Sequence, residues 1–149
     1  MSRLRSLLLD QLRVTLMGLF SWLFGAPAIE AELPGPGFFE VEAVGESNYQ
    51  PAIKKARHGA AEGRAVEVRA TLILENDNPH DKLAVRVDIE GRTVGYLDRD
   101  NARAYRKELK RVGHPSISAT CAAKIVGGGR RPEGGRKMLG VLLDIPTVD

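Results

Sequence analysis

The sequence predicts a mainly β (α+β) fold: a small OB-like or SH3-like β-barrel of five to six strands with two short helices, plus a separate N-terminal helix. Two observations lead to this fold class. Several segments between residues 38 and 145 alternate apolar and polar side chains, which is the period of a β-strand. Turn-forming pairs such as Asn78-Pro79 and Glu90-Gly91 separate these segments.

Length and composition place limits on the function. A chain of 149 residues fits one domain with a modest core, and a net charge of +3 does not by itself identify a nucleic-acid-binding protein. The one cysteine, Cys121, excludes an intramolecular disulfide, and its place in an alternating segment predicts a buried structural thiol. The three histidines show no metal-ligand spacing with it, so neither a metal nor a cofactor is expected.

Residues 1–25 differ from the rest of the chain, because leucines recur at helical spacing and the part after Arg13 is apolar almost all round. Three interpretations stay open. A transmembrane helix needs about 20 predominantly apolar residues, and the uninterrupted run is about half that. A cleaved signal peptide would end at residues 26–28, where a proline disfavours cleavage. We favour an amphipathic helix that attaches to a membrane surface or a protein partner through residues 3–25.

Residues 26–37 are expected to be a linker, since they include the run Pro-Gly-Pro-Gly at 34–37 and few apolar side chains. The barrel domain is then expected to span residues 38–149. Because its fold does not depend on disulfides, we expect a cytoplasmic protein that can associate with a membrane through its N-terminal helix.

The first half of the domain is expected to contain two strands and a helix. Residues 38–44 alternate as a first strand. Pro51 suits the first turn of a short helix over 51–58. A long strand over 64–75 follows, with apolar residues at every even position from 66 to 74.

The second half begins with a hairpin that turns at Glu90-Gly91. Its first strand has an apolar face made of Leu83, Val85, Val87 and Ile89.

A helix follows, with Asp98 or Asp100 as its cap, an apolar stripe and a basic stripe. The apolar stripe contains Ala102, Tyr105, Leu109 and Val112, and the basic stripe contains Arg99, Arg103, Arg106 and Lys110. Two further strands, over 117–126 and 138–145, enclose a basic, glycine-rich loop.

The segment 76–81 is a polar elbow between two strands, and its polar side chains exceed what a turn requires. Three blocks around it resemble the HIRAN domain family: V-G-E-S-N-Y-Q at 44–50, D-N-P-H-D-K-L-A-V at 77–85, and V-G-Y-L at 94–97. The resemblance covers residues 38–149. HIRAN domains are small β-barrel modules that occur alone in bacteria and fused to helicase-like translocases in eukaryotes.

The resemblance implies binding of single-stranded DNA at its 3′ end. By position, Asp81 is expected to contact the terminal hydroxyl, with His80 and Tyr96 around the last nucleotides. Asn78 would make a polar contact and Arg99 a backbone contact. The residues themselves agree, since Tyr49, His80 and Tyr96 offer stacking faces, and a carboxylate suits a hydroxyl donor while repelling a 3′-phosphate.

This chain departs from the family pattern at Ser47-Asn48, where DNA-binding eukaryotic members carry an arginine and an aromatic residue. A phosphate contact and a stacking face worth about 1–3 kcal/mol are therefore missing. Asn48 stays a candidate contact; Ser47, Arg103, Arg130 and Arg131 are weaker ones.

Catalysis is not expected, because the chain contains no phosphate-binding loop, paired-histidine metal motif or nucleophile elbow. The alternative function is a protein-interaction module with little DNA binding, tethered to a membrane or partner by the N-terminal helix. In that interpretation, Asn78 and Asp81 only stabilise their own turn, and the basic stripe is a solvated face.

Overall fold

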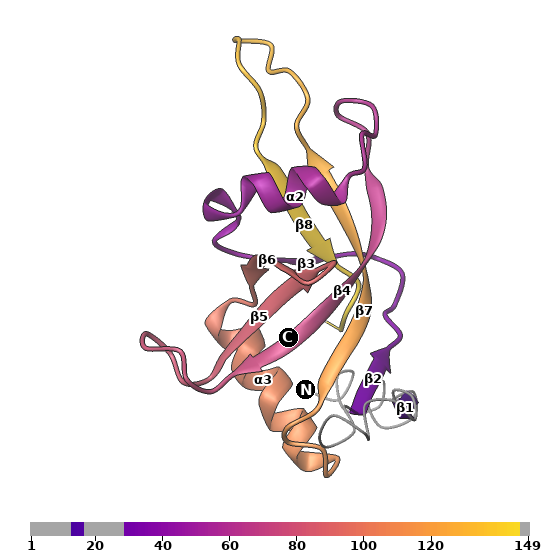
Figure 1. Ribbon diagram of the computed structural model, residues 1–149, viewed down its shortest axis with the longest axis vertical. Helices are drawn as coiled ribbons and strands as arrows, with labels where there is room; N and C mark the ends of the chain where they lie inside the picture. The colour runs from indigo at the N-terminus through magenta and orange to yellow at the C-terminus, as the bar shows by residue number, and fades with distance from the viewer. Residues whose placement is uncertain (1–12, 17–28, 147–149) are drawn as a thin grey trace.

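The computed structural model, which describes residues 13–16 and 29–146, has a mainly β fold (Figure 1). Within these residues, a curled and largely antiparallel sheet forms a half-barrel of the small OB-like kind, and two α-helices pack on it. The predicted mainly β, OB-like class with two helices is confirmed.

The strands are β1 (Arg13–Leu16), β2 (Ile29–Leu33), β3 (Val41–Glu42), β4 (Val66–Glu75), β5 (Ala84–Ile89), β6 (Arg92–Tyr96), β7 (Ser118–Gly127) and β8 (Leu139–Leu143). The helices are α2 (Gln50–Ala56) and α3 (Arg99–Arg111), with a short 3-10 turn, η2 (Glu46–Asn48), before α2.

The two long strands, β4 and β7, form the centre of the sheet. β4 pairs antiparallel with both β5 and β7. The other edge of β7 is shared between β2, which runs parallel to it, and β8, which runs antiparallel. β3 pairs with β8, and a bridge from Val44 to Tyr96 joins the chain after β3 to β6. This bridge brings the two ends of the curled sheet together.

The core forms where the alternating faces of the strands meet. Ala70 and Leu72 of β4 and Val85 and Val87 of β5 are fully buried, as their spacing predicts. Cys121 of β7 is buried among them, and burial raises the pKa of its thiol to about 12. The expectation of a structural thiol is confirmed.

Helix α3 begins and packs as predicted. The Asp98 carboxylate accepts a hydrogen bond from the backbone N–H of Asn101 at 2.9 Å, which caps the first turn. Its apolar stripe faces the sheet, with Ala102, Tyr105 and Leu109 buried. The basic stripe, on an adjacent face of the helix, carries the arginines that face the elbow.

The expected linker over 26–37 needs a correction, because Ile29–Leu33 form β2 and pair with β7. Ala31 and Leu33 are buried in the core. The sequence I-E-A-E-L does alternate, but its short length between prolines concealed the strand. The sheet therefore begins before residue 38.

The segment after β2 is fixed by a buried acid. The Asp144 carboxylate accepts a hydrogen bond from the backbone N–H of Gly37 at 2.8 Å, and a Cβ on Gly35 would lie 1.9 Å from the Asp144 carbonyl oxygen. The strand predicted over 38–44 is shorter in the structure. β3 covers Val41–Glu42, backbone hydrogen bonds continue through Ala43 and Val44, and Phe38 is exposed.

The N-terminal helix predicted over 1–25 lies mostly outside the described residues. Its described part, Arg13–Leu16, forms β1, antiparallel to β2, instead of a helical turn. Among the described residues, no helix is both long and apolar enough to cross a membrane.

Candidate nucleic-acid interface

The three sequence blocks at 44–50, 77–85 and 94–97 meet at one side of the half-barrel. The backbones of Val44 and Tyr96 exchange two hydrogen bonds, of 2.8 and 2.9 Å, and Leu97 N–H donates to the Val85 carbonyl at 2.9 Å. Gly95 permits this approach, since a Cβ there would lie 2.8 Å from the Val44 carbonyl oxygen. The glycine of V-G-Y-L is thus required by a close backbone contact.

The elbow is held by the side chain of Asn78. Its Oδ1 accepts hydrogen bonds from the backbone N–H groups of His80 at 2.8 Å and Asp81 at 3.0 Å. Its Nδ2 donates to the Glu75 carboxylate at 2.8 Å. Both ends of the amide are therefore engaged within the protein, which makes Asn78 a positioning residue for its neighbours.

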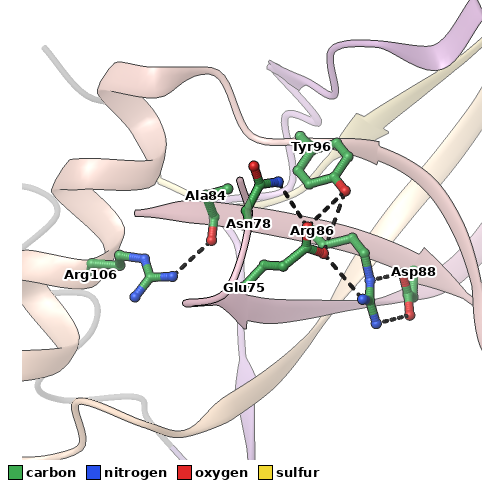
Figure 2. Close-up of polar contacts among 7 residues, drawn as sticks. All are labelled: Glu75, Asn78, Ala84, Arg86, Asp88, Tyr96 and Arg106. Atoms are coloured by element: carbon green, nitrogen blue, oxygen red, sulfur yellow. Dashed lines mark hydrogen bonds and ion pairs between the residues drawn. The ribbon is translucent and has the colours of Figure 1, made fainter. Parts of the chain in front are cut away.

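Glu75, at the end of β4, is the acceptor on which this region converges (Figure 2). It receives hydrogen bonds from Asn78, from the Tyr96 hydroxyl at 3.1 Å and from Arg86 Nη1 at 3.1 Å. Arg86 also binds both oxygens of Asp88, at 2.9 and 3.0 Å. Two carboxylates and one guanidinium make this cluster acidic, and both carboxylates are largely buried.

The electrostatics of the cluster follow from these contacts. The hydrogen bonds to Asp88 raise the pKa of the Arg86 guanidinium above its usual value. Burial and the adjacent Glu75 carboxylate raise the pKa of the Tyr96 phenol. Tyr96 therefore stays protonated at neutral pH and acts as the donor in its bond to Glu75.

Tyr96 and Tyr49 form an aromatic pair beside the elbow. Their ring centroids lie 6.4 Å apart and the planes are inclined by 47°. Both side chains are half-buried, so one surface of the pair remains accessible. The structure brings these two predicted stacking residues together.

Asp81, the last residue of the elbow, faces α3. Its Oδ1 accepts a hydrogen bond from Leu83 N–H at 3.0 Å, and only 19 % of its side chain is exposed. Arg99 and Arg103 each approach a carboxylate oxygen to 4.0 Å. Because of the turn at Asp81, β5 begins only at Ala84. Leu83, which was expected on the apolar face of this strand, therefore precedes it and is exposed.

Arg106 attaches the elbow to α3. Its guanidinium donates to the carbonyls of Leu83 and Ala84, each at 2.8 Å, and to the Asn76 side chain at 2.7 Å. Figure 2 shows it reaching Ala84 from the helix. Burial lowers the pKa of Arg106, an effect that Asp81 partly offsets. The basic stripe thus has one member that supports the fold and two, Arg99 and Arg103, that remain more exposed.

The remaining predicted residues fall into two places. His80 is exposed on the elbow, and Ser47 and Asn48 are exposed in η2, directly before Tyr49. Arg130 and Arg131 lie in the β7–β8 hairpin, well away from the elbow in Figure 1.

Sequence reasoning missed Glu75, Arg86 and Asp88. A signal was present, since Arg86 and Asp88 are oppositely charged and stand two apart on the polar face of β5. Among residues 13–16 and 29–146, no group of three His, Cys, Asp or Glu side chains is arranged to hold a metal ion.

No protein-family model, curated protein or solved structure matches the chain, so the HIRAN resemblance stays a prediction.

Proposed function

We propose that this domain is a non-catalytic module that binds single-stranded DNA at a free 3′ end. The observation that carries the proposal is the link between the half-exposed Tyr49–Tyr96 ring pair and the elbow, where Tyr96 and Asn78 share the Glu75 carboxylate and Asp81 faces Arg99 and Arg103. A base can stack on the rings while cations contact the backbone, which is the combination that single-strand binding requires.

The free 3′-hydroxyl is assigned to Asp81. Because Leu83 N–H occupies Oδ1, Oδ2 is the oxygen left to accept a hydrogen bond from the terminal sugar. A 3′-phosphate would bring negative charge against this carboxylate and cannot donate in the same way. The rigid elbow, fixed by Asn78 and Arg106, holds Asp81 in place before DNA arrives.

Fluorescence anisotropy of the full chain with a short labelled single strand tests the proposal, using a 3′-hydroxyl end and a 3′-phosphate end. Asp81→Asn removes the charge but keeps an acceptor for Leu83 N–H. We expect wild type to prefer the hydroxyl end and Asp81→Asn to lose the preference. Asp77→Asn, on the same elbow, is the matched control. Equal binding of both ends by wild type would overturn the proposal.

A protein-interaction module is the second candidate function. It is favoured by the exposed side chains of Val44 and Leu83, each 43 % accessible, which border the same site. Salt dependence separates the two. When the logarithm of the binding constant is plotted against the logarithm of the salt concentration, contacts to Z phosphates of a single strand give a slope of about −0.7Z. An apolar protein contact gives little slope.

A further inference from the structure

A cleft of about 450 Å³ separates α2 from the base of the β7–β8 hairpin. Helix α2 lies across the sheet below this hairpin in Figure 1. The cleft is lined by polar and cationic side chains of both elements, chiefly Gln50, Lys54, Arg57, Arg136 and Lys137. None of the residues assigned to the end-binding site lines it.

The lining is strongly basic. Four cationic side chains face one carboxylate, Glu62, whose oxygen lies 2.9 Å from Arg136 Nε. Within the described part of the chain, Lys54 and Lys137 form no ion pair, and both are exposed. A cleft with this charge attracts an anion.

Arg57 adds a buried donor. Its guanidinium Nη2 donates to the carbonyls of Ala61 and Arg64, which fixes the side chain, yet its Nε is buried and meets no acceptor in the described residues. Buried donors normally have partners. Arg57 therefore contributes a fixed positive charge to the wall of the cleft.

The cleft is preformed on one side. The Gln50 amide exchanges two hydrogen bonds with the Leu139 backbone, at 2.8 and 2.9 Å, which holds the start of α2 against β8. Gln50, Lys54 and Arg57 stand at positions i, i+4 and i+7 and therefore share one face of the helix. Cationic side chains are thus aligned along a rigid wall.

This face begins next to the aromatic pair. Tyr49 immediately precedes Gln50, and α2 packs on both β6, which carries Tyr96, and β8. Over its seven residues the helix rises about 10 Å, which leads from the rings towards the hairpin. A strand that stacks on the rings can continue along this face of α2 towards the cleft.

We propose that the cleft binds the phosphodiester backbone of the strand whose 3′ end occupies the elbow, so that DNA runs 5′ from Tyr49 along α2. This inference rests on the proposed end-binding function and extends it. It gives the module a footprint of several nucleotides and assigns a backbone contact to Lys54 and Lys137. It also supplies phosphate contacts that Ser47-Asn48 do not.

The test compares the full chain on labelled 3′-hydroxyl strands of about four and about ten nucleotides, lengths within the site sizes of single-strand-binding barrels. The double variant Lys54→Gln/Lys137→Gln removes the two unpaired cations. Lys55→Gln/Lys107→Gln removes equal charge from exposed positions outside the cleft.

We expect the cleft variant to weaken binding of the long strand about tenfold and to leave the short strand unchanged. Its log–log salt slope on the long strand is expected to flatten by about 1.4, the value for two phosphate contacts. Equal losses in the control variant would overturn the inference.

Two other outcomes separate this inference from the proposed function. If the 3′-hydroxyl preference persists and the cleft variant binds the long strand like wild type, the inference fails alone. If the long strand binds through the cleft without regard to its 3′ end or to Asp81→Asn, both fail, and the cleft is an independent polyanion site.

Discussion

The Tyr96 hydroxyl donates to the Glu75 carboxylate at 3.1 Å and so joins the end of β6 to the end of β4. This contact sets the ring of Tyr96 at the elbow, because Glu75 is itself held by Asn78 and Arg86. The proposed stacking surface is therefore positioned by a buried acid. The Tyr96–Glu75 hydrogen bond can be removed experimentally while the ring that it orients is kept.

Tyr96→Phe keeps the ring and removes the hydrogen bond. Since the acceptor is charged and largely buried, we expect the free energy of unfolding to fall by about 1.5 kcal/mol. Urea denaturation measures this change.

Tyr105→Phe is the matched control, because the Tyr105 hydroxyl is buried and has no hydrogen-bond partner among the described residues. Its removal is expected to be neutral or stabilising. A larger loss for Tyr105→Phe than for Tyr96→Phe would contradict the assignment.

Asn78→Ala tests the elbow. The substitution leaves the backbone N–H groups of His80 and Asp81 without their acceptor and removes a donor from Glu75. We expect a loss of about 1–2 kcal/mol in stability and faster amide hydrogen exchange at residues 80 and 81. Asp77→Ala, at an exposed position, is expected to change neither. Unchanged exchange in Asn78→Ala would show that the turn holds itself.

Much of the fold was predictable because its signals are local. The alternation of β4 and the Asp98 cap each depend on neighbours within a few residues, and both appear as expected. β2 was not predictable in this way. Its stability comes from parallel pairing with β7, in which Glu30 lies opposite Ser118, and no local pattern encodes so distant a partner.

The candidate site was predictable only in part, because some of its contacts are local in the sequence and others join distant strands. Asn78 bonds its own turn, a tendency of the residue type. The contact of Glu75 with Arg86 depends instead on the register of β4 against β5, where Ile73 faces Arg86. Sequence alone does not fix that register, so the acidic cluster beneath Tyr96 became visible only in the structure.

Arg106→Lys separates an arginine that supports the fold from one that is proposed to contact DNA. A lysine cannot reproduce the guanidinium fork that binds Leu83, Ala84 and Asn76. We expect a stability loss of about 1–2 kcal/mol and no change in the salt slope of DNA binding. Arg103→Gln is expected to do the reverse, flattening the slope at constant stability. Calorimetry and salt titrations of both variants check the pair.

The pH dependence of stability depends on Glu46, whose carboxylate accepts a hydrogen bond from Val141 N–H at 2.6 Å. Burial raises the pKa of Glu46 above its ordinary 4.5, despite that bond. Between pH 4.5 and the raised pKa, the folded chain binds more protons at Glu46 than the unfolded chain does. In this pH interval Glu46 therefore makes the free energy of unfolding fall as pH rises. Glu46→Gln keeps the acceptor, and we expect it to remove this decline.

Urea titrations of wild type and Glu46→Gln at several values between about pH 4 and pH 8 measure the difference between the two curves. Glu40→Gln, at an exposed position, is the control and is expected to follow wild type. As pH rises through this interval, Glu46→Gln should become increasingly more stable than wild type. Above the interval, the difference in the free energy of unfolding should stay constant. A gap that instead widens as pH falls would mean that the folded chain favours the ionised carboxylate, with the Val141 bond outweighing burial.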